Sequence, residues 1–323
     1  MASFSLSFLQ WCLISILFRS AFSQLSENFY SASCPKAHSI ISHHVKNAIK
    51  KEPRMGASML RLQFHDCGVG GCDGSNLLDD TKNSTGEKSA LLNLNSARGF
   101  EVIDKIKNRL EQSCPGVVSC ADILAMVGRE CVFRLGGPNY TLPLGRRDST
   151  ESHRLLADAM VPIFLKGVEA QIAAFQSLGF NKNEFVALTG AHTVGMARCE
   201  SYRQHIYEDK NIDPTFAASL QANCPKEGGN NNTAPIDNRT PFVFDNMYFV
   251  NLMKQKGLLA TDQGLFTGKG GPTDAIVANY SSSKDNFFKE FASAIVKFGQ
   301  LGVLTGTKGE IRTNCRKVNT PKA

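Results

Sequence analysis

Apolar residues recur along this chain every three or four positions, the spacing of an amphipathic helix. Four segments show this period most clearly: 40–49, 100–110, 168–178 and 287–298. Short runs of glycine and proline punctuate the chain between such segments, at 136–138, 228–229 and 270–272. Ser119, Asp122 and Ser283 lie where helices are expected to begin. Alternating strand patterns are scarce, with one candidate at 140–144, so the pattern predicts a mainly α fold with little sheet.

The N-terminal segment, residues 1–23, has the pattern of a signal peptide. Phe4–Phe18 is apolar but short for a membrane span, and the small residues of Ala21–Ser23 suit cleavage before Gln24. The absence of lysine or arginine near the start keeps an uncleaved anchor as the alternative. No later stretch is long and apolar enough to span a bilayer. The sequence therefore predicts a secreted protein of the extracellular space or cell wall, with no membrane contact after cleavage.

Size and charge set broad limits on the function. A chain of 323 residues can bury a full core as one or two closely packed domains. The formal net charge of +7 comes without a lysine or arginine run, which argues against nucleic acid as a partner. A basic surface is compatible with adhesion to acidic cell-wall polysaccharide, although an ordinary soluble basic protein is the simpler interpretation.

Cysteine usage also indicates secretion. Ten cysteines are present, and removal of Cys12 with the leader leaves an odd number, so one thiol must stay free. Cys131 is the expected free residue because it lies in the apolar run 121–133 and resembles a small buried hydrophobe. Spacing alone leaves about 105 ways to pair the other eight. Sequons typical of a secreted glycoprotein begin at Asn83, Asn139, Asn231, Asn238 and Asn279.

The strongest chemical signal is Arg61 with His65, four positions apart and therefore on one face of a helix. A neutral imidazole can carry a proton between the two oxygens of a peroxide, while the guanidinium stabilises the negative charge on the departing oxygen. His192 could be the axial ligand of a haem iron beneath them. Each residue alone has an ordinary interpretation as a packed histidine or a solvated arginine. His65, Cys67 and Cys72 could also form a zinc cluster, but the cysteine count argues against it.

Eight short motifs then follow one another in order: 61–67, 71–73, 98–104, 118–124, 144–148, 187–193, 244–246 and 261–263. Through them the chain resembles the secreted plant haem peroxidases (class III, horseradish-peroxidase-like) from about Gln24 to Asn319. The resemblance implies a two-part helical fold with one haem b held between two halves. The distal half would be residues 24–160 and the proximal half residues 161–323.

The resemblance also implies roles for the residues around the haem. On the distal side His65 would be the acid/base, Arg61 the transition-state stabiliser and Phe64 a wall of the peroxide site. Asn93 would accept the imidazole N–H and leave the other nitrogen free for a proton, with Glu87 bracing Asn93. On the proximal side His192 would bind the iron, and Asp262 would accept the second N–H of His192.

Two calcium ions per chain are implied as well, since hard cations take oxygen ligands. The distal ion would be held by Asp66, Val69, Gly71, Asp73 and Ser75, with Glu87 acting indirectly. The proximal ion would be held by Thr193, Asp237, Thr240, Val243 and Asp245. The implied disulfides are Cys34–Cys114, Cys67–Cys72, Cys120–Cys315 and Cys199–Cys224.

The substrate rim is where the chain departs most from the family. Counting from His192 without gaps puts Val161 at the expected proline, whereas a one-residue shift brings Pro162 there. Gln63 and Gly68 replace a usual histidine and a usual phenylalanine.

The expected function is that of a secreted, monomeric haem peroxidase. It would reduce hydrogen peroxide to water and oxidise phenolic or similar small donors by one-electron steps. The alternative is a catalytically weak, calcium-stabilised cell-wall-binding protein on the same scaffold. The presence together of Arg61, His65, Asn93, His192 and Asp262 favours the enzyme.

Overall fold

The computed structural model describes residues 25–82, 84–159 and 167–320. Several sequence predictions therefore lie outside the described residues. These are the signal peptide 1–23, the sequon at Asn83, the rim residues Val161 and Pro162, and the boundary between residues 160 and 161. Among the described residues no helix is long and apolar enough to cross a membrane.

Helices are the main secondary structure of the described residues. They are α2 (Ala37–Lys51), α3 (Arg54–Cys67), α4 (Phe100–Ser113), α5 (Cys120–Arg134), α6 (Arg154–Ala159), α8 (Val168–Ser177), α9 (Lys182–Thr189), α10 (Cys199–Glu208), α11 (Pro214–Gln221), α12 (Met247–Met253), α13 (Ala260–Gln263), α14 (Asp274–Ser282) and α15 (Lys284–Phe298). Short 3₁₀ turns are η1 (Ser75–Leu77), η2 (Glu87–Ser89) and η3 (Gly190–Thr193). The four periodic segments are thus confirmed as α2, α4, α8 and α15. The side chains of Ser119 and Ser283 cap α5 and α15 by accepting backbone N–H groups.

The sheet in the described residues is one antiparallel pair, β1 (Met196–Arg198) with β2 (Thr233–Pro235). The expectation of little sheet is confirmed, and the one candidate strand, at 140–144, does not form. Alternate residues of that segment are buried, which explains the pattern, yet only Leu144 is bridged, to Ser26. The alternation therefore reflects packing against the core without a neighbouring strand.

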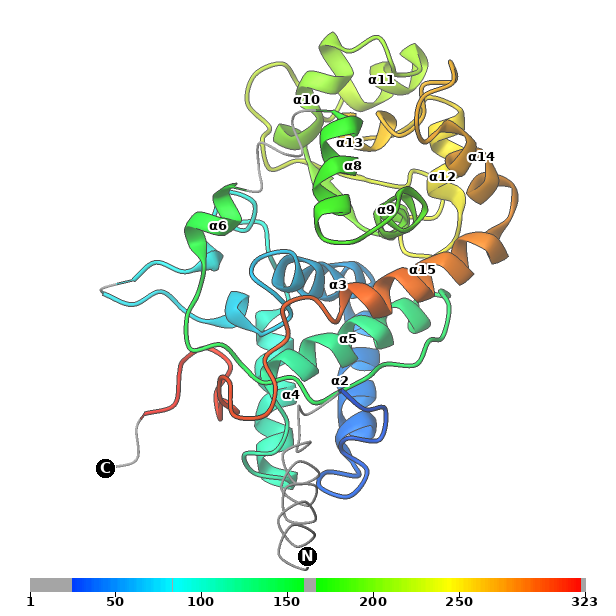
Figure 1. The fold of residues 1–323 in the computed structure, drawn as a ribbon. Helices are drawn as coiled ribbons and strands as arrows, with labels where there is room; N and C mark the ends of the chain where they lie inside the picture. Colours follow the sequence, from blue (N-terminus) through cyan, green and yellow to red (C-terminus); the bar gives the residue numbers. More distant parts are fainter. Residues whose placement is uncertain (1–24, 83, 160–166, 321–323) are drawn as a thin grey trace, which may run out of the picture.

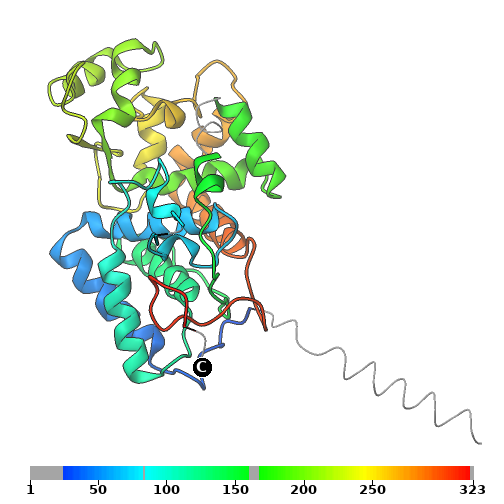
Figure 2. The same ribbon diagram turned by 90° about the vertical axis from the view of Figure 1, so that its left-hand side faces the viewer.

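Figure 1 shows two groups of helices. One holds α2, α3, α4 and α5, and the other holds α8 to α14, while α15 runs between them; Figure 2 shows the same division from the side. One hydrophobic cluster continues through both groups, from Ile41 in α2 to Phe298 in α15. The structure is therefore the two-part, mainly α fold that the resemblance implied, with α3 packed on α5 and α9 on α15.

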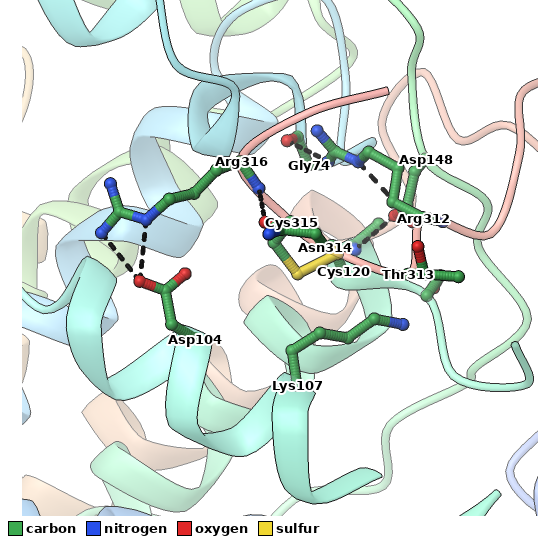
Figure 3. The surroundings of a disulfide bond; sticks show 12 residues. Gly74, Asp104, Lys107, Cys120, Asp148, Arg312, Thr313, Asn314, Cys315 and Arg316 are labelled. Atoms are coloured by element: carbon green, nitrogen blue, oxygen red, sulfur yellow. Dashed lines mark hydrogen bonds and ion pairs between the residues drawn. A yellow bond between two sulfur atoms is a disulfide. The ribbon is translucent and has the colours of Figure 1, made fainter. Parts of the chain in front are cut away.

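The chain beyond α15 returns to the first group of helices. Cys315 is bonded to Cys120 at the start of α5, and Figure 3 shows this disulfide beside Arg312. Arg312 is fully buried, donates its backbone N–H to Asp148 (2.9 Å) and donates from Nη2 to the carbonyl of Gly74 (2.5 Å). Arg312 and Cys315 therefore complete the packing of the first half.

All four disulfides have the implied partners: Cys34–Cys114, Cys67–Cys72, Cys120–Cys315 and Cys199–Cys224. Cys131 is free and buried, as the sequence predicted. Burial raises the pKa of this thiol above its ordinary range, so it stays protonated and unreactive.

Two of the disulfides close loops of very different length and should therefore stabilise the protein unequally. Cys120–Cys315 spans 195 residues and Cys199–Cys224 spans 25. Loop-closure entropy predicts losses of about 5 and about 3 kcal/mol when each pair is changed to alanine. We expect Cys120→Ala/Cys315→Ala to lower the unfolding free energy measured in urea by about 2 kcal/mol more than Cys199→Ala/Cys224→Ala. Equal losses would contradict this.

Candidate active site

Helix α3 divides its residues between the core and the site. Met55, Met59 and Leu62 are buried, whereas Arg61 and His65 lie on the half-exposed face. Arg54, Ser58 and Phe64 share that face. The three- and four-residue spacing thus anchors the helix on one side and presents a row of polar groups on the other.

The orientation of the His65 ring is fixed by Asn93. The Nδ2 of Asn93 donates to the carbonyl of Glu87 (2.9 Å), which turns the Oδ1 of Asn93 toward Nδ1 of His65 at 2.5 Å. Since an amide oxygen only accepts, this network assigns the imidazole hydrogen to Nδ1. Nε2 of His65 therefore has a lone pair, and it accepts from Nε of Arg61 at 3.0 Å.

Arg61 is held at its far end by two acceptors. Nη1 donates to Ser96 Oγ (2.8 Å) and Nη2 donates to the carbonyl of Leu92 (2.6 Å). Burial, followed by the charges of Arg198 and Arg54, lowers the pKa of Arg61 to about 10. The guanidinium therefore stays charged at neutral pH.

His192 lies at η3, directly after α9, and is tied to Asp262 in α13. Its Nδ1 lies 2.9 Å from Oδ1 of Asp262. The His192 side chain is 44% exposed, but that of Asp262 is only 4% exposed. Burial lowers the pKa of His192, but the charge of Asp262 and its hydrogen bond outweigh this effect and raise the pKa overall. Because Nδ1 donates to the carboxylate, Nε2 is the nitrogen presented to a ligand.

His65 and His192 are close enough to interact electrostatically. Burial first, then the charge of Arg61, lowers the pKa of His65 to about 3, and His192 contributes in the same direction. Arg61 in turn lowers the pKa of His192. His192 would hold a haem iron through its imidazole, and His65 and Arg61 would supply a base and a fixed cation near it, so these residues fit a haem.

Arg54 and Arg198 belong to this site but were not predicted from the sequence. Both act on Arg61 through their charge, so three guanidinium groups gather there from α3 and β1. These cations could hold the two carboxylates of haem b. Arg54 could have been found, since it precedes Arg61 by two helical turns on the same face, but Arg198 has no local signal.

Phe64 is the remaining predicted distal residue. Its ring packs against Phe298 of α15 with centroids 5.0 Å apart. The structure thus brings Arg61 and Asn93 to His65, with Phe64 on the same helix face, and brings Asp262 to His192.

The distal calcium residues contain buried oxygens that lack partners. Among the described residues, Asp66 Oδ1, Ser75 Oγ and Glu87 Oε2 are buried without a hydrogen bond. Burial, then the charge of Asp73, raises the pKa of Asp66 well above its usual range, and burial raises the pKa of Glu87 to about 7. A bound cation would relieve these carboxylates, so the residues fit a calcium ion.

The proximal calcium residues also converge. Thr240 Oγ1 lies 3.2 Å from both Asp237 Oδ2 and Asp245 Oδ1, and Thr193 Oγ1 lies 3.5 and 3.2 Å from the same two atoms. No three His, Cys, Asp or Glu side chains in the described ranges form a metal cluster. Each proposed set has only two direct carboxylates and otherwise hydroxyl or carbonyl oxygens, which suits a hard ion. Cys67 and Cys72 are bonded to each other, so their sulfurs are not available to a zinc cluster with His65.

Comparison with known proteins agrees with this geometry. The sequence model described as peroxidase matches residues 41–283. Peroxidase P7 of Brassica rapa subsp. rapa is 49% identical over 298 residues, which are 92% of this chain and 100% of the relative. Peroxidase 4 of Vitis vinifera is 47% identical over 320 residues, 98% of this chain and 99% of the relative. Peroxidase 70 of Zea mays is 49% identical over 310 residues, 95% of each chain.

The chain therefore belongs to the peroxidase family. It is a haem-dependent peroxidase, as the resemblance to class III enzymes implied. The alternative of a catalytically weak wall-binding protein finds no support in these comparisons.

The low pKa of His65 predicts how the rate of reaction with hydrogen peroxide depends on pH. With a pKa of about 3, the imidazole of His65 is neutral at higher pH and free to accept a proton, whereas at lower pH it is already protonated. The bimolecular rate constant for hydrogen peroxide should therefore stay level from about pH 7 to about pH 4 and then fall. Stopped-flow measurement with the Soret band as a control for bound haem checks this. A midpoint near the ordinary histidine value of 6.5 would contradict it.

Proposed function

We propose that this peroxidase reduces hydrogen peroxide to water through His65 and Arg61, and oxidises phenolic or similar small donors by one-electron steps. The bound haem supplies the redox centre that takes two electrons to peroxide and recovers them singly from two donor molecules. The observation that carries the proposal is the fixed His65 ring, with Nδ1 on Asn93 and Nε2 available beside a charged Arg61.

The proton path follows from that geometry. Nε2 of His65 takes a proton from one peroxide oxygen and returns it to the other, which leaves as water. Arg61 stabilises the negative charge on the departing oxygen because Ser96 and Leu92 keep its guanidinium in place. Peroxide would compete with Arg61 for the Nε2 lone pair. His192 would hold the iron from the other side through Nε2.

We propose that the donor binds at Val161 or at Pro162, the two alternative positions at which the family resemblance puts the substrate rim. Oxidation of guaiacol and a panel of phenols by the purified haem protein tests the donor class. Val161→Ala and Pro162→Gly should change the donor concentration that gives half-maximal rate while leaving the peroxide reaction unchanged. No turnover of any phenol in the presence of a normal peroxide reaction would refute the phenolic assignment.

We also propose that the protein is secreted as a monomer after removal of residues 1–23. Its two halves would be residues 24–160 and 161–323. Four disulfides in the described residues suit an oxidising compartment. The asparagines of the four described sequons are exposed, as attachment of a glycan requires. Acidic cell-wall polysaccharide is the proposed surface partner because of the net positive charge.

Two histidine variants should distinguish the proposed role of His65 in the peroxide reaction from that of His192 in haem binding. His65→Ala should slow the reaction with peroxide by at least about a hundredfold, the usual contribution of a positioned acid/base, while keeping the Soret band. His192→Ala should instead weaken haem binding and change the Soret band, because it removes the iron ligand. His43→Ala, an exposed histidine of α2, is the matched control and should change neither. A His65→Ala protein with the wild-type rate would refute the assignment.

The calcium proposal predicts a stoichiometry. Elemental analysis of the purified protein should find two calcium ions per chain. Asp73→Asn and Asp237→Asn should each reduce the count to one, since each removes a carboxylate from a different proposed site. Asp285→Asn, an exposed aspartate of α15, is the control and should keep both ions. Retention of two ions in either test variant would rule out that residue as an essential ligand.

A further inference from the structure

The carboxylate of Asp262 has one oxygen without an assigned role. Oδ1 accepts from His192, but Oδ2 is buried and meets no hydrogen-bond geometry with any partner in the described part of the chain. The hydroxyl of Tyr248 in α12 is in the same condition. Both residues are almost fully buried, Tyr248 at 2% and Asp262 at 3% exposure. An unpaired carboxylate oxygen and an unpaired hydroxyl at this depth are each costly.

Tyr248 lies against both members of the proximal pair. Its ring meets the His192 ring edge to face, with centroids 6.3 Å apart and planes at 84°. Burial first, and then the charge of Asp262, raises the pKa of Tyr248 well above its ordinary value, which indicates that the phenol lies near this carboxylate. A phenol keeps its hydrogen at neutral pH, so the Tyr248 hydroxyl can donate it to a neighbouring acceptor.

The hydroxyl of Tyr248 has two neighbouring side chains to which it could donate. Thr189 is one, and its own hydroxyl hydrogen is already donated to the carbonyl of Val186 at 2.8 Å. Asp262 is the other, and it is charged. A hydrogen bond to a carboxylate is about twice as strong as one between neutral groups, so the carboxylate is the preferred acceptor.

We propose that Tyr248 donates its hydroxyl hydrogen to Oδ2 of Asp262 and is thereby a positioning residue for the proximal histidine. This inference rests on the proposed role of His192 as the iron ligand. It adds a third member to the pair, a phenol that shares the negative charge of Asp262 with the imidazole.

The electronic consequence has a definite sign. A donor at Oδ2 withdraws charge from the carboxylate, so Oδ1 accepts less strongly from Nδ1–H of His192. His192 is then a weaker electron donor to iron. Removing the phenol hydroxyl should strengthen the pull of Asp262, make His192 a stronger donor, and favour the oxidised state of the iron.

The test is Tyr248→Phe in the haem-loaded protein, with two measurements other than turnover. The iron–histidine stretching band of the ferrous form, by resonance Raman, should move to higher frequency. The ferric/ferrous reduction potential should become more negative. Tyr202→Phe is the matched control, because Tyr202 also carries a buried hydroxyl without a partner in the described residues but belongs to the separate cluster around α10. It should shift neither measurement.

The outcomes separate this inference from the proposed function. If the wild-type protein shows no iron–histidine band, the role of His192 fails first. If the band is present but Tyr248→Phe shifts neither the band nor the reduction potential, as expected for the control Tyr202→Phe, only the inference about Tyr248 is overturned. A shift to lower frequency would also overturn it.

A second measurement applies if the Tyr248→Phe protein does not accumulate. Wild-type protein produced with 3-fluorotyrosine has a more acidic phenol, which is a stronger donor. The iron–histidine band should then move to lower frequency, opposite to the effect of Tyr248→Phe. An unmoved band would overturn the proposal.

Discussion

The site depends on one shared constraint, the tethering of two histidines through Nδ1. His65 is tethered to the amide oxygen of Asn93 at 2.5 Å and His192 to the carboxylate of Asp262 at 2.9 Å. Each tether leaves Nε2 as the reactive nitrogen. The difference in charge between the tethers then distinguishes the rings. The amide of Asn93 is neutral and adds no charge, so burial and Arg61 lower the pKa of His65. The carboxylate of Asp262 raises the pKa of His192 and would make its imidazole a stronger electron donor to a metal.

The segments that surround the two histidines hold these hydrogen bonds in place. Asp66 follows His65 and Thr193 follows His192, so each proposed calcium site adjoins one ring. Phe64 contacts Phe298 of α15, and the segment after α15 binds the loop that contains Gly74. Gly74 also donates its backbone N–H to Asp66 of α3, so movement of this loop would disturb α3 and the distance between Arg61 and His65.

The sequence predicted those parts of the structure that leave a local pattern. Helical periodicity placed α2, α4, α8 and α15, and the four-residue spacing of Arg61 and His65 located the distal face. The strand at 140–144 failed because alternating burial does not require a neighbouring strand. Asn93 and Asp262 lie 28 and 70 residues from their histidines, so only the family resemblance could connect them. Arg198 and Tyr248 were missed because one resembles a surface charge and the other an ordinary core aromatic.

The return of the chain end to the first half also constrains the order in which the protein can be completed during synthesis. Cys120 cannot form its disulfide until Cys315, 195 residues later, has been synthesised, and Asp148 cannot bind Arg312 before that residue is made. Until the last few residues have left the ribosome, the start of α5 carries an unpaired thiol while other cysteines are already available to it. Of the disulfides in the described residues, Cys120–Cys315 therefore leaves its first cysteine unpaired for the longest stretch of synthesis, and Cys120 can pair wrongly during that time. Thiol–disulfide exchange, or rapid burial of Cys120 by the helices already formed, would then favour the correct pair.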